Sequence, residues 1–375
     1  MIRALSIARI AGIEIRVHFS LIFVVALVTL SVATQAEAFP TDWSDAARFA
    51  AGGVLAVMFL ASILIHELAH GIVARRRGLP VRTITLAFFG GITTIDPAAH
   101  GPRDEAAISS SGPIASLIVG LPLTVIGFVL DPTTTVAGLG FAVVGIVNVG
   151  LGLLNLLPAM PLDGGRLLHA WVWERTGDAT RAGRATAVAG RYIGIVGIGA
   201  GIVVSLLGDS LTGVLIVLSG WFIMQGSRVT ERRLAIEALL SGMRVGEVME
   251  RDVASIGPQL TIDTFADQLL GEGERTSVPV MDEGALVGVL GIAQLRRLAR
   301  KRWPLMRAAD IMVSKPALPS LTPEDAAWAG MELLRESGLD GIPVESEGSL
   351  LGLLTRKSLV AAIQARSAEQ TRTGA

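Results

Sequence analysis

Apolar residues of this 375-residue chain gather in long runs over residues 1–227, with short polar joints between them, whereas residues 243–365 alternate as soluble α/β domains do. A helix that crosses a membrane needs about 20 mainly apolar residues. The runs predict six transmembrane helices, of which the last two are short and Gly-rich, as in a hairpin that only just crosses. They are His18–Thr34, Phe49–Ala74, Ala106–Leu130, Val136–Leu157, Tyr192–Leu207 and Leu211–Gln225.

Composition supports a membrane protein. Hydrophobic residues make up 51% of the chain and charged residues 17%, against about 25% charged residues in a typical soluble protein. We therefore predict a polytopic α-helical membrane domain over 1–227, a linker over 228–243 and a separate α/β module after it. The net charge of −1 gives no indication of nucleic-acid binding, and no nucleic-acid partner is expected.

Arginine placement predicts the orientation, because positive charge accumulates in cytoplasmic joints. Arg3, Arg9 and Arg16 precede the first run, and further arginines fill alternate joints, at 75–82, 166–191 and 228–233. The N-terminus and the α/β module are thus both expected in the cytoplasm. The N-terminal residues lack the compact apolar core and cleavage site of a removable signal peptide, so the first run is expected to be retained.

The stretch "ILIHELAHGIVARRRG" (63–78) places two histidines and a glutamate in the second apolar run. On a helix, residues i and i+4 share a face, so His66 and His70 can hold one ion, and Glu67 lies about 100° around the axis. This is the H-E-x-x-H arrangement of two zinc ligands and a general base. The chain has no cysteine, so any metal must be held by His, Asp or Glu.

The same string also arises by chance in ordinary helices, where it has a purely structural role. The setting argues against that interpretation, because the chain has only five histidines. An ionisable residue inside a membrane is costly and usually functional. A metal site is therefore the favoured interpretation.

A catalytic zinc usually has three protein ligands and one open position. Most acidic residues of the membrane domain fall in polar joints, and Asp163 in "NLLPAMPLDGGRLLH" is the exception. Asp163 ends the fourth run at the cytoplasmic side, at the depth expected for His70. Asp163 also suits a helix N-cap, and His169 is the competing third ligand.

"HELAH" followed by "NLLPAMPLDGG" resembles the site-2 protease family of intramembrane zinc metalloproteases. "FFGGI" (88–92) lies in a strand-like stretch that is too short to span a membrane, and it resembles the glycine pair of the family's membrane-embedded sheet. "PRDEAAISSSGPIAS" (102–116) resembles the segment that leads into the family's next helix. The resemblance implies that His66, His70 and Asp163 bind one Zn²⁺ and that Glu67 is the general base.

It further implies that Asn155 contacts the substrate backbone or the oxyanion. We expect the strand at Gly90 and Gly91 to hold an unwound substrate segment. A second apolar-run asparagine, Asn148, is expected to make only an interhelical hydrogen bond.

The α/β module contains a repeat. "VGEVM" recurs as "AADIM", and "TSVPVMDEGALVGVL" as "DGIPVESEGSLLGLL". The two β-α-β-β-α copies resemble a cystathionine-β-synthase (CBS) domain pair, with domains over 244–302 and 303–366 and a disordered tail over 367–375. The resemblance implies a regulatory module, a homodimer formed through it and an adenine nucleotide, with Thr355 and Ser358 at the positions that contact the ribose. Ser358 replaces the usual Asp, and the first copy has Gly291 and Gln294 there, which puts nucleotide binding in doubt.

Taken together, the motifs predict an intramembrane zinc endopeptidase in a prokaryotic cell membrane. It would cleave a membrane-anchored protein in or near a transmembrane segment, as in regulated intramembrane proteolysis. The alternative is a membrane transporter or channel gated by its CBS pair, but no half-helix repeat of the transporter kind is visible. An inactive relative that acts as a scaffold is disfavoured because every catalytic residue of the motif is present.

Overall fold

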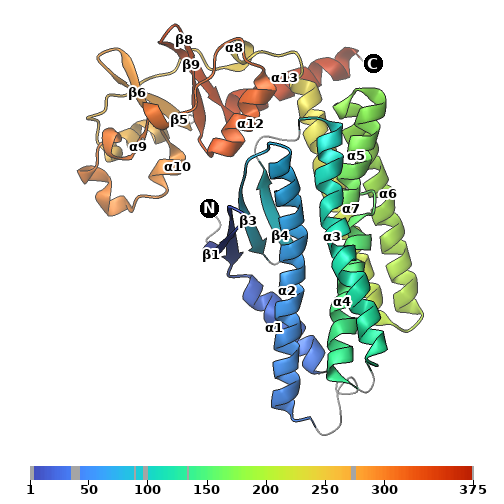
Figure 1. Cartoon of the computed structure of the whole chain (residues 1–375). Coiled ribbons are helices and arrows are strands. Elements are labelled where there is room, and N and C mark those ends of the chain that lie inside the picture. Colours follow the sequence, from blue (N-terminus) through green and yellow to red (C-terminus); the bar gives the residue numbers. More distant parts are fainter. Residues whose placement is uncertain are drawn as a thin grey trace. The chain divides into compact units, whose positions relative to one another are not determined.

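The computed structural model describes residues 4–34, 43–87, 90–95, 100–132, 135–271 and 276–373 (Figure 1). The chain divides into two compact units, Met1–Arg232 and Arg233–Ala375. The first unit contains the apolar runs and the second contains the repeat. This division agrees with the two modules expected from the hydrophobic pattern.

Five helices of the described residues are long and apolar enough to cross a membrane. They are α2 (Asp45–Arg76), α3 (Pro102–Val129), α4 (Val136–Asn155), α6 (Ala179–Leu206) and α7 (Ser210–Leu240). The last two are longer than predicted and are not a hairpin that only just crosses. The run at His18–Thr34 differs more, because helix α1 covers only Leu21–Ala33, 13 residues. At about 1.5 Å per residue α1 is shorter than a bilayer core of about 30 Å.

A four-stranded sheet lies beside α2 (Figure 1). Its strands are β1 (Ala4–Ile10), β2 (Ile13–His18), β3 (Val81–Ala87) and β4 (Gly90–Ile95), in that order, with β2 parallel to β3 and the other pairs antiparallel. Strands β3 and β4 confirm the predicted strand-like stretch. The hairpin β1–β2, which turns at Ala11 and Gly12 with positive φ, was not predicted.

The sheet packs on the face of α2 next to the histidines. Ile13 and Ile84 are completely buried, and a Cβ built at Gly71 of α2 would lie 2.9 Å from the Ile13 side chain. Such close packing needs a residue without a side chain at position 71. The packing of the sheet against α2 therefore holds in place the part of the helix that carries residues 66–70.

The remaining helices of the first unit pack as neighbours, α3 against α2, α4 and α5 (Asp163–Thr176), and α5 against α6. Asn148 of α4 donates a hydrogen bond of 2.7 Å to Ser62 of α2, and it is buried. This confirms the interhelical role predicted for Asn148. It joins α4 to α2 one turn before His66.

The second unit contains the two copies of the repeat. The first comprises α8 (Val245–Val248), α9 (Ile262–Gly271), β5 (Ser277–Asp282), β6 (Ala285–Gly291), α10 (Ile292–Leu295) and the 3-10 helix η2 (Arg300–Leu305). The second comprises α11 (Ala308–Ile311), β7 (Val313–Ser314), η3 (Lys315–Ala317), α12 (Ala327–Ser337), β8 (Gly341–Ser346), β9 (Ser349–Thr355) and α13 (Arg356–Thr373). In each copy the expected first strand is a single bridge, Ile256 to Val280 and Leu321 to Val344.

The two copies exchange the short helices with which they begin, α8 and α11. Val245 and Val248 of α8 lie in the core of the second copy, and Ala308 of α11 lies in the core of the first. The pair is thus one interlocked body. Two boundaries differ from the sequence expectation: most of the linker predicted at 228–243 continues helix α7 to Leu240, and α13 runs to Thr373, through most of the tail predicted as disordered.

Candidate metal centre

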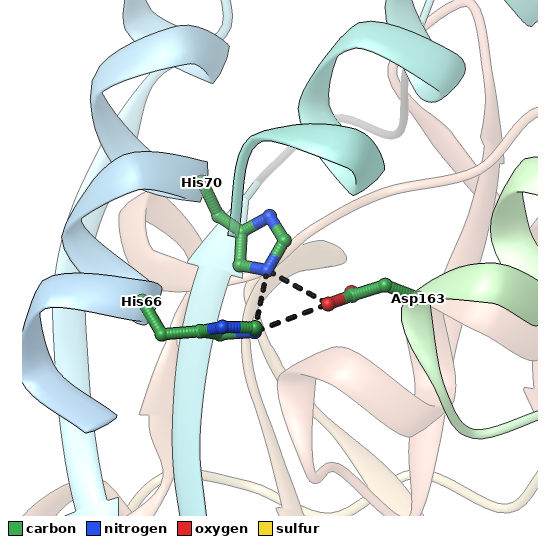
Figure 2. A group of neighbouring side chains, drawn as sticks. All are labelled: His66, His70 and Asp163. Carbon is green, nitrogen blue, oxygen red and sulfur yellow. Dashed lines mark hydrogen bonds and ion pairs between the residues drawn. The ribbon is translucent and has the colours of Figure 1, made fainter. Parts of the chain in front are cut away.

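Three side chains from two helices converge in the first unit (Figure 2). The Nε2 atoms of His66 and His70 each lie 3.1 Å from Oδ2 of Asp163, and 3.2 Å from one another. Both histidines are buried on α2, and Asp163 begins α5. The i, i+4 spacing on α2 and the fold of α5 bring together the three residues that the sequence singled out.

This set of donor atoms fits a tetrahedral zinc ion. Zinc binds imidazole nitrogen and carboxylate oxygen at about 2.0–2.2 Å, which places neighbouring donors about 3.3 Å apart. The observed 3.1–3.2 Å separations match that spacing. His66, His70 and Asp163 also form the one cluster of possible metal-binding groups found among the described residues.

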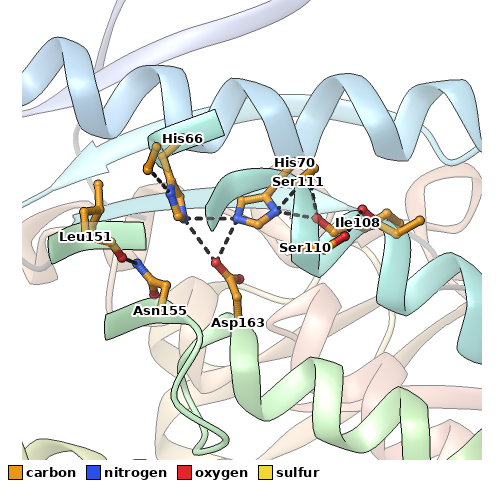
Figure 3. A network of polar contacts seen from close by, with 10 residues as sticks. His66, His70, Ile108, Ser110, Ser111, Leu151, Asn155 and Asp163 are labelled. Atoms are coloured by element: carbon orange, nitrogen blue, oxygen red, sulfur yellow. Dashed lines mark hydrogen bonds and ion pairs between the residues drawn. The ribbon is translucent and has the colours of Figure 1, made fainter. Parts of the chain in front are cut away.

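The second nitrogen of each imidazole is also held (Figure 3). His70 Nδ1 lies 2.7 Å from the carbonyl oxygen of Ile108. That oxygen only accepts, so Nδ1 carries the proton and Nε2 keeps its lone pair for a ligand. His66 Nδ1 lies 2.9 Å from Oγ of the buried Ser116. Both partners lie on α3, so α3 orients both rings, as partners of metal-binding histidines commonly do.

Gly112 of α3 provides the room for the two rings. A Cβ built at this position would lie 2.7 Å from His66 Nε2 and 2.6 Å from His70 Cε1, and real Cβ atoms do not approach so closely. The sequence motifs alone assign no role to Gly112 or Ser116. The Gly-Pro pair inside an apolar helix was the available signal, because both residues are unfavourable there unless packing requires them.

Asp163 is placed by close packing at the start of α5. The N-cap role suggested for Asp163 is wrong, because the N-cap is Leu162 and Asp163 is the first residue of the helix. Its carboxylate bonds to the two histidines instead. A Cβ built at Gly165 would lie 2.6 Å from the backbone nitrogen of Met160. The glycines that follow Asp163 therefore allow α5 to begin directly against the preceding loop.

Glu67 faces the edge strand β4. A Cβ built at Gly91 would lie 2.8 Å from Oε1 of Glu67, so the carboxyl group occupies the space that the glycine leaves. Gly90 precedes it on the same strand. Phe88 and Phe89 of "FFGGI" lie outside the described residues.

The other two candidates have hydrogen-bond partners outside the histidine–aspartate cluster. His169 binds Glu105 through Nδ1 at 2.7 Å and the Ala179 carbonyl through Nε2 at 3.2 Å. The hydrogen bond to Glu105 raises the pKa of His169 above its usual value. Asn155, at the end of α4, donates a 3.0 Å hydrogen bond to the Leu151 carbonyl of its own helix (Figure 3).

In the second unit, Thr355 and Ser358 are engaged with protein atoms. Thr355 Oγ1 donates to Glu250 at 2.6 Å and accepts from the Ser358 backbone N–H at 3.1 Å. Ser358 Oγ accepts from the Thr355 N–H at 3.2 Å. A ribose at this position would have to displace the bond to Glu250.

Family models match both units. The model of peptidase family M50 matches residues 54–143 and 138–199, and the CBS domain model matches 245–301 and 308–365. A Mycobacterium tuberculosis protein named "Putative zinc metalloprotease Rip3" is 34% identical, covering 94% of this chain and 91% of its own length. "Zinc metalloprotease MJ0392" of Methanocaldococcus jannaschii is 26% identical over 95% of this chain and 94% of its own length.

Solved structures match each unit separately. "Site-2 Protease from Methanocaldococcus jannaschii" covers 60% of this chain and 94% of its own at 23% identity, with a TM-score of 0.41. "Crystal structure of CBSX2 in complex with AMP" covers 33% of this chain and 99% of its own at 28% identity, with a TM-score of 0.29. The family matches and the full-length relative decide between a protease and a transporter. The chain belongs to peptidase family M50, the site-2 proteases, as a multi-pass zinc metalloendopeptidase with two CBS domains.

Proposed function

We propose that this protein cleaves a membrane-anchored protein in or near a transmembrane segment, in regulated intramembrane proteolysis. His66, His70 and Asp163 hold the zinc ion, and Glu67 is the general base. The main support for the proposal is the triangle formed by the two histidine Nε2 atoms and Oδ2 of Asp163, beside Glu67. It lies between helices that are long enough to span a bilayer, where a substrate's transmembrane segment can approach.

When bound, zinc acidifies water and polarises the scissile carbonyl. Glu67 accepts the proton of the attacking water and then delivers it to the leaving amine, a role that general acid–base catalysis assigns to a positioned carboxylate. The protein holds the two imidazoles by bonds to α3, so their ligand atoms need no rearrangement. Pre-positioned groups of this kind act without a reorganisation cost during the reaction.

Asn155 is proposed to stabilise the oxyanion or to bind the substrate backbone. Its amide lies at the end of α4, eight residues before Asp163. It now bonds to Leu151 of its own helix, a weak local partner that a substrate carbonyl can replace. An amide N–H suits the negative charge that develops on that oxygen.

Strand β4 is proposed to bind the unwound substrate. β4 is the last strand in the sheet order, and β3 is its partner. An extended peptide can pair with such an edge through its main chain. Because Gly91 lies against Glu67, a peptide on this edge would pass next to the general base.

The replacement Glu67→Gln tests the function. In purified protein with a transmembrane reporter substrate, we expect cleavage to fall at least 10³-fold while bound zinc stays at the wild-type level. Glu174→Gln, which changes an exposed glutamate paired with Arg103, is the matched control and should cleave normally. Unimpaired cleavage by Glu67→Gln would refute the proposal.

A second replacement tests the role of β4. Gly90→Val and Gly91→Val should both block cleavage, because β-branched side chains crowd the strand edge and, at 91, Glu67 itself. Zinc content should remain unchanged, because the side chain that lies against Gly91 is Glu67 and not a zinc ligand. Normal cleavage by Gly90→Val would remove β4 from the substrate path.

The CBS pair is proposed to be regulatory and to form a homodimer, with the N-terminus and the pair in the cytoplasm of a prokaryotic cell. The arginine distribution supports this orientation. An adenine nucleotide remains a candidate ligand from the family resemblance. The bonds of Thr355 to Glu250 and Ser358 argue against the ribose contact at these two residues.

A further inference from the structure

Positive charge in the second unit is concentrated in one segment. Residues 233–375 contain 16 Lys or Arg and 19 Asp or Glu, yet residues 296–307, "RRLARKRWPLMR", contain six of those basic residues and no acidic one. The rest of the unit is therefore strongly acidic. We call residues 296–307 the basic segment.

The charges of the basic segment face solvent. All six basic residues are exposed, and none of their side chains forms an ion pair with a carboxylate among the residues that the structure describes. Arg300 lies over the Trp303 ring at 5.4 Å, and Arg307 bonds to Gln259. Six exposed cations that have no ion-pair partner among the described residues repel one another, and an anionic partner would relieve this repulsion.

Apolar groups accompany these cations. Leu305 is 82% exposed. Arg296, Arg300 and Trp303 line a cavity of about 480 Å³ whose other walls are Ala266, Ile292, Leu295 and Leu298. Cations interleaved with Trp and Leu are typical of segments that lie at a membrane surface. Nucleic acid would offer charge but no apolar partner for Leu305.

The repeat itself does not require the basic segment. After β9, the second copy closes with the long helix α13, whereas after β6 the first copy closes with α10 and the short η2 that carries the cations. The second unit also continues directly from α7, a candidate span. Because α7 would anchor the second unit to the bilayer, the membrane surface is present at a high effective concentration for the basic segment.

We propose that the basic segment docks the CBS unit onto the anionic lipid surface of the membrane that holds the first unit. The cations bind lipid phosphates, and Leu305 and Trp303 enter the interface. Each Lys or Arg near such a surface strengthens binding roughly fivefold. The proposal does not depend on the protease chemistry, so Glu67→Gln should dock as the wild type does.

The full chain without native cysteines allows a direct test. Leu305→Cys, labelled with an environment-sensitive fluorophore, is reconstituted in nanodiscs that contain a doxyl-lipid quencher, with or without 30% phosphatidylglycerol. We expect quenching in the anionic discs alone, and its loss at high salt. Lys301→Gln with Arg302→Gln should weaken docking about 25-fold, whereas the matched pair Arg356→Gln with Lys357→Gln, after β9 of the second copy, should leave it unchanged.

Three results would overturn the proposal. They are an unquenched label in anionic discs, equal quenching in neutral discs, and equal effects of the two double replacements. A label in neutral discs that responds instead to a short RNA or DNA duplex at physiological salt would assign the basic segment to nucleic acid. Circular dichroism and zinc content of each variant show that the protein remains folded.

Discussion

At the scale of single residues, the metal centre depends on α3 as much as on the ligands. α2 carries both histidines, but Ser116 and the Ile108 carbonyl fix the orientation of their rings. Gly112 leaves the space in which the rings meet. The ligand geometry is thus a property of the α2–α3 contact.

Ser116→Ala should weaken zinc binding. Loss of the 2.9 Å bond leaves His66 Nδ1 without its buried partner, and removal of such partners typically costs 10- to 100-fold in metal affinity. Competition with a chelator of known affinity measures the effect. Ser110→Ala, which removes only a bond to the Ala107 carbonyl of its own helix, should bind zinc normally; equal affinities for all three proteins would contradict the role of Ser116.

Gly112→Ala should be more damaging, because the new methyl group would overlap both imidazoles. We expect zinc affinity to fall by more than 100-fold. Gly150→Ala, on α4, is the matched control, because a Cβ there meets nothing within 4 Å. Retention of wild-type affinity by Gly112→Ala in the same chelator assay would show that the rings do not depend on this space.

The sequence was sufficient to propose the ligands but not their supports. His66 and His70 share a face by helical spacing alone, and Asp163 was found as an acidic residue at matching depth. Ser116 lies 50 positions from His66, and no local pattern predicts that two helices meet at that point. The side-chain direction of Asn155 was equally beyond prediction, because it depends on the local end of α4.

At the scale of elements, α5 is held to α2 at one place and to α3 at another. Asp163 meets the histidines of α2, and His169, about two turns later, bonds to Glu105 of α3. Arg166 lies 3.8 Å from the same carboxylate. This second contact fixes α5, and thus Asp163, relative to α3.

The contact between His169 and Glu105 should make stability depend on pH. The pKa of His169 is raised in the folded protein, so its stabilising charge is fully present below the unfolded pKa of about 6.5 and is lost as pH rises through the folded value. We expect His169→Gln to lower the melting temperature by about 2–4 °C at pH 6 and to have little effect at pH 9. A pH-independent difference between the two proteins would contradict this account.

The elements that the sequence missed have a physical explanation. Residues 4–18 alternate and turn at Ala11–Gly12 as a hairpin does, but their arginines predict only a cytoplasmic flank. Helix α1 begins three residues after the start of the predicted run, because His18 still belongs to strand β2. In the repeat, the VPV and VGVL strands were predictable from alternation, whereas the exchange of α8 and α11 is a long-range feature without a local signal.

At the scale of the whole molecule, the arginines predict that the joint between α6 and α7 lies opposite the CBS pair. Leu207→Cys should react with a membrane-impermeant maleimide in intact cells. Ala309→Cys should react only after the cells are opened. Labelling of Ala309→Cys in intact cells would reverse the proposed orientation.

Zinc content per chain tests the central claim most directly. It is measured on purified wild type, Glu67→Gln and Asp163→Ala, with cleavage of the transmembrane reporter measured in the same preparations. The account predicts one zinc per chain in the wild type and in Glu67→Gln, little in Asp163→Ala, and cleavage by the wild type alone. A full complement of zinc in Asp163→Ala, or cleavage by Glu67→Gln, would contradict it.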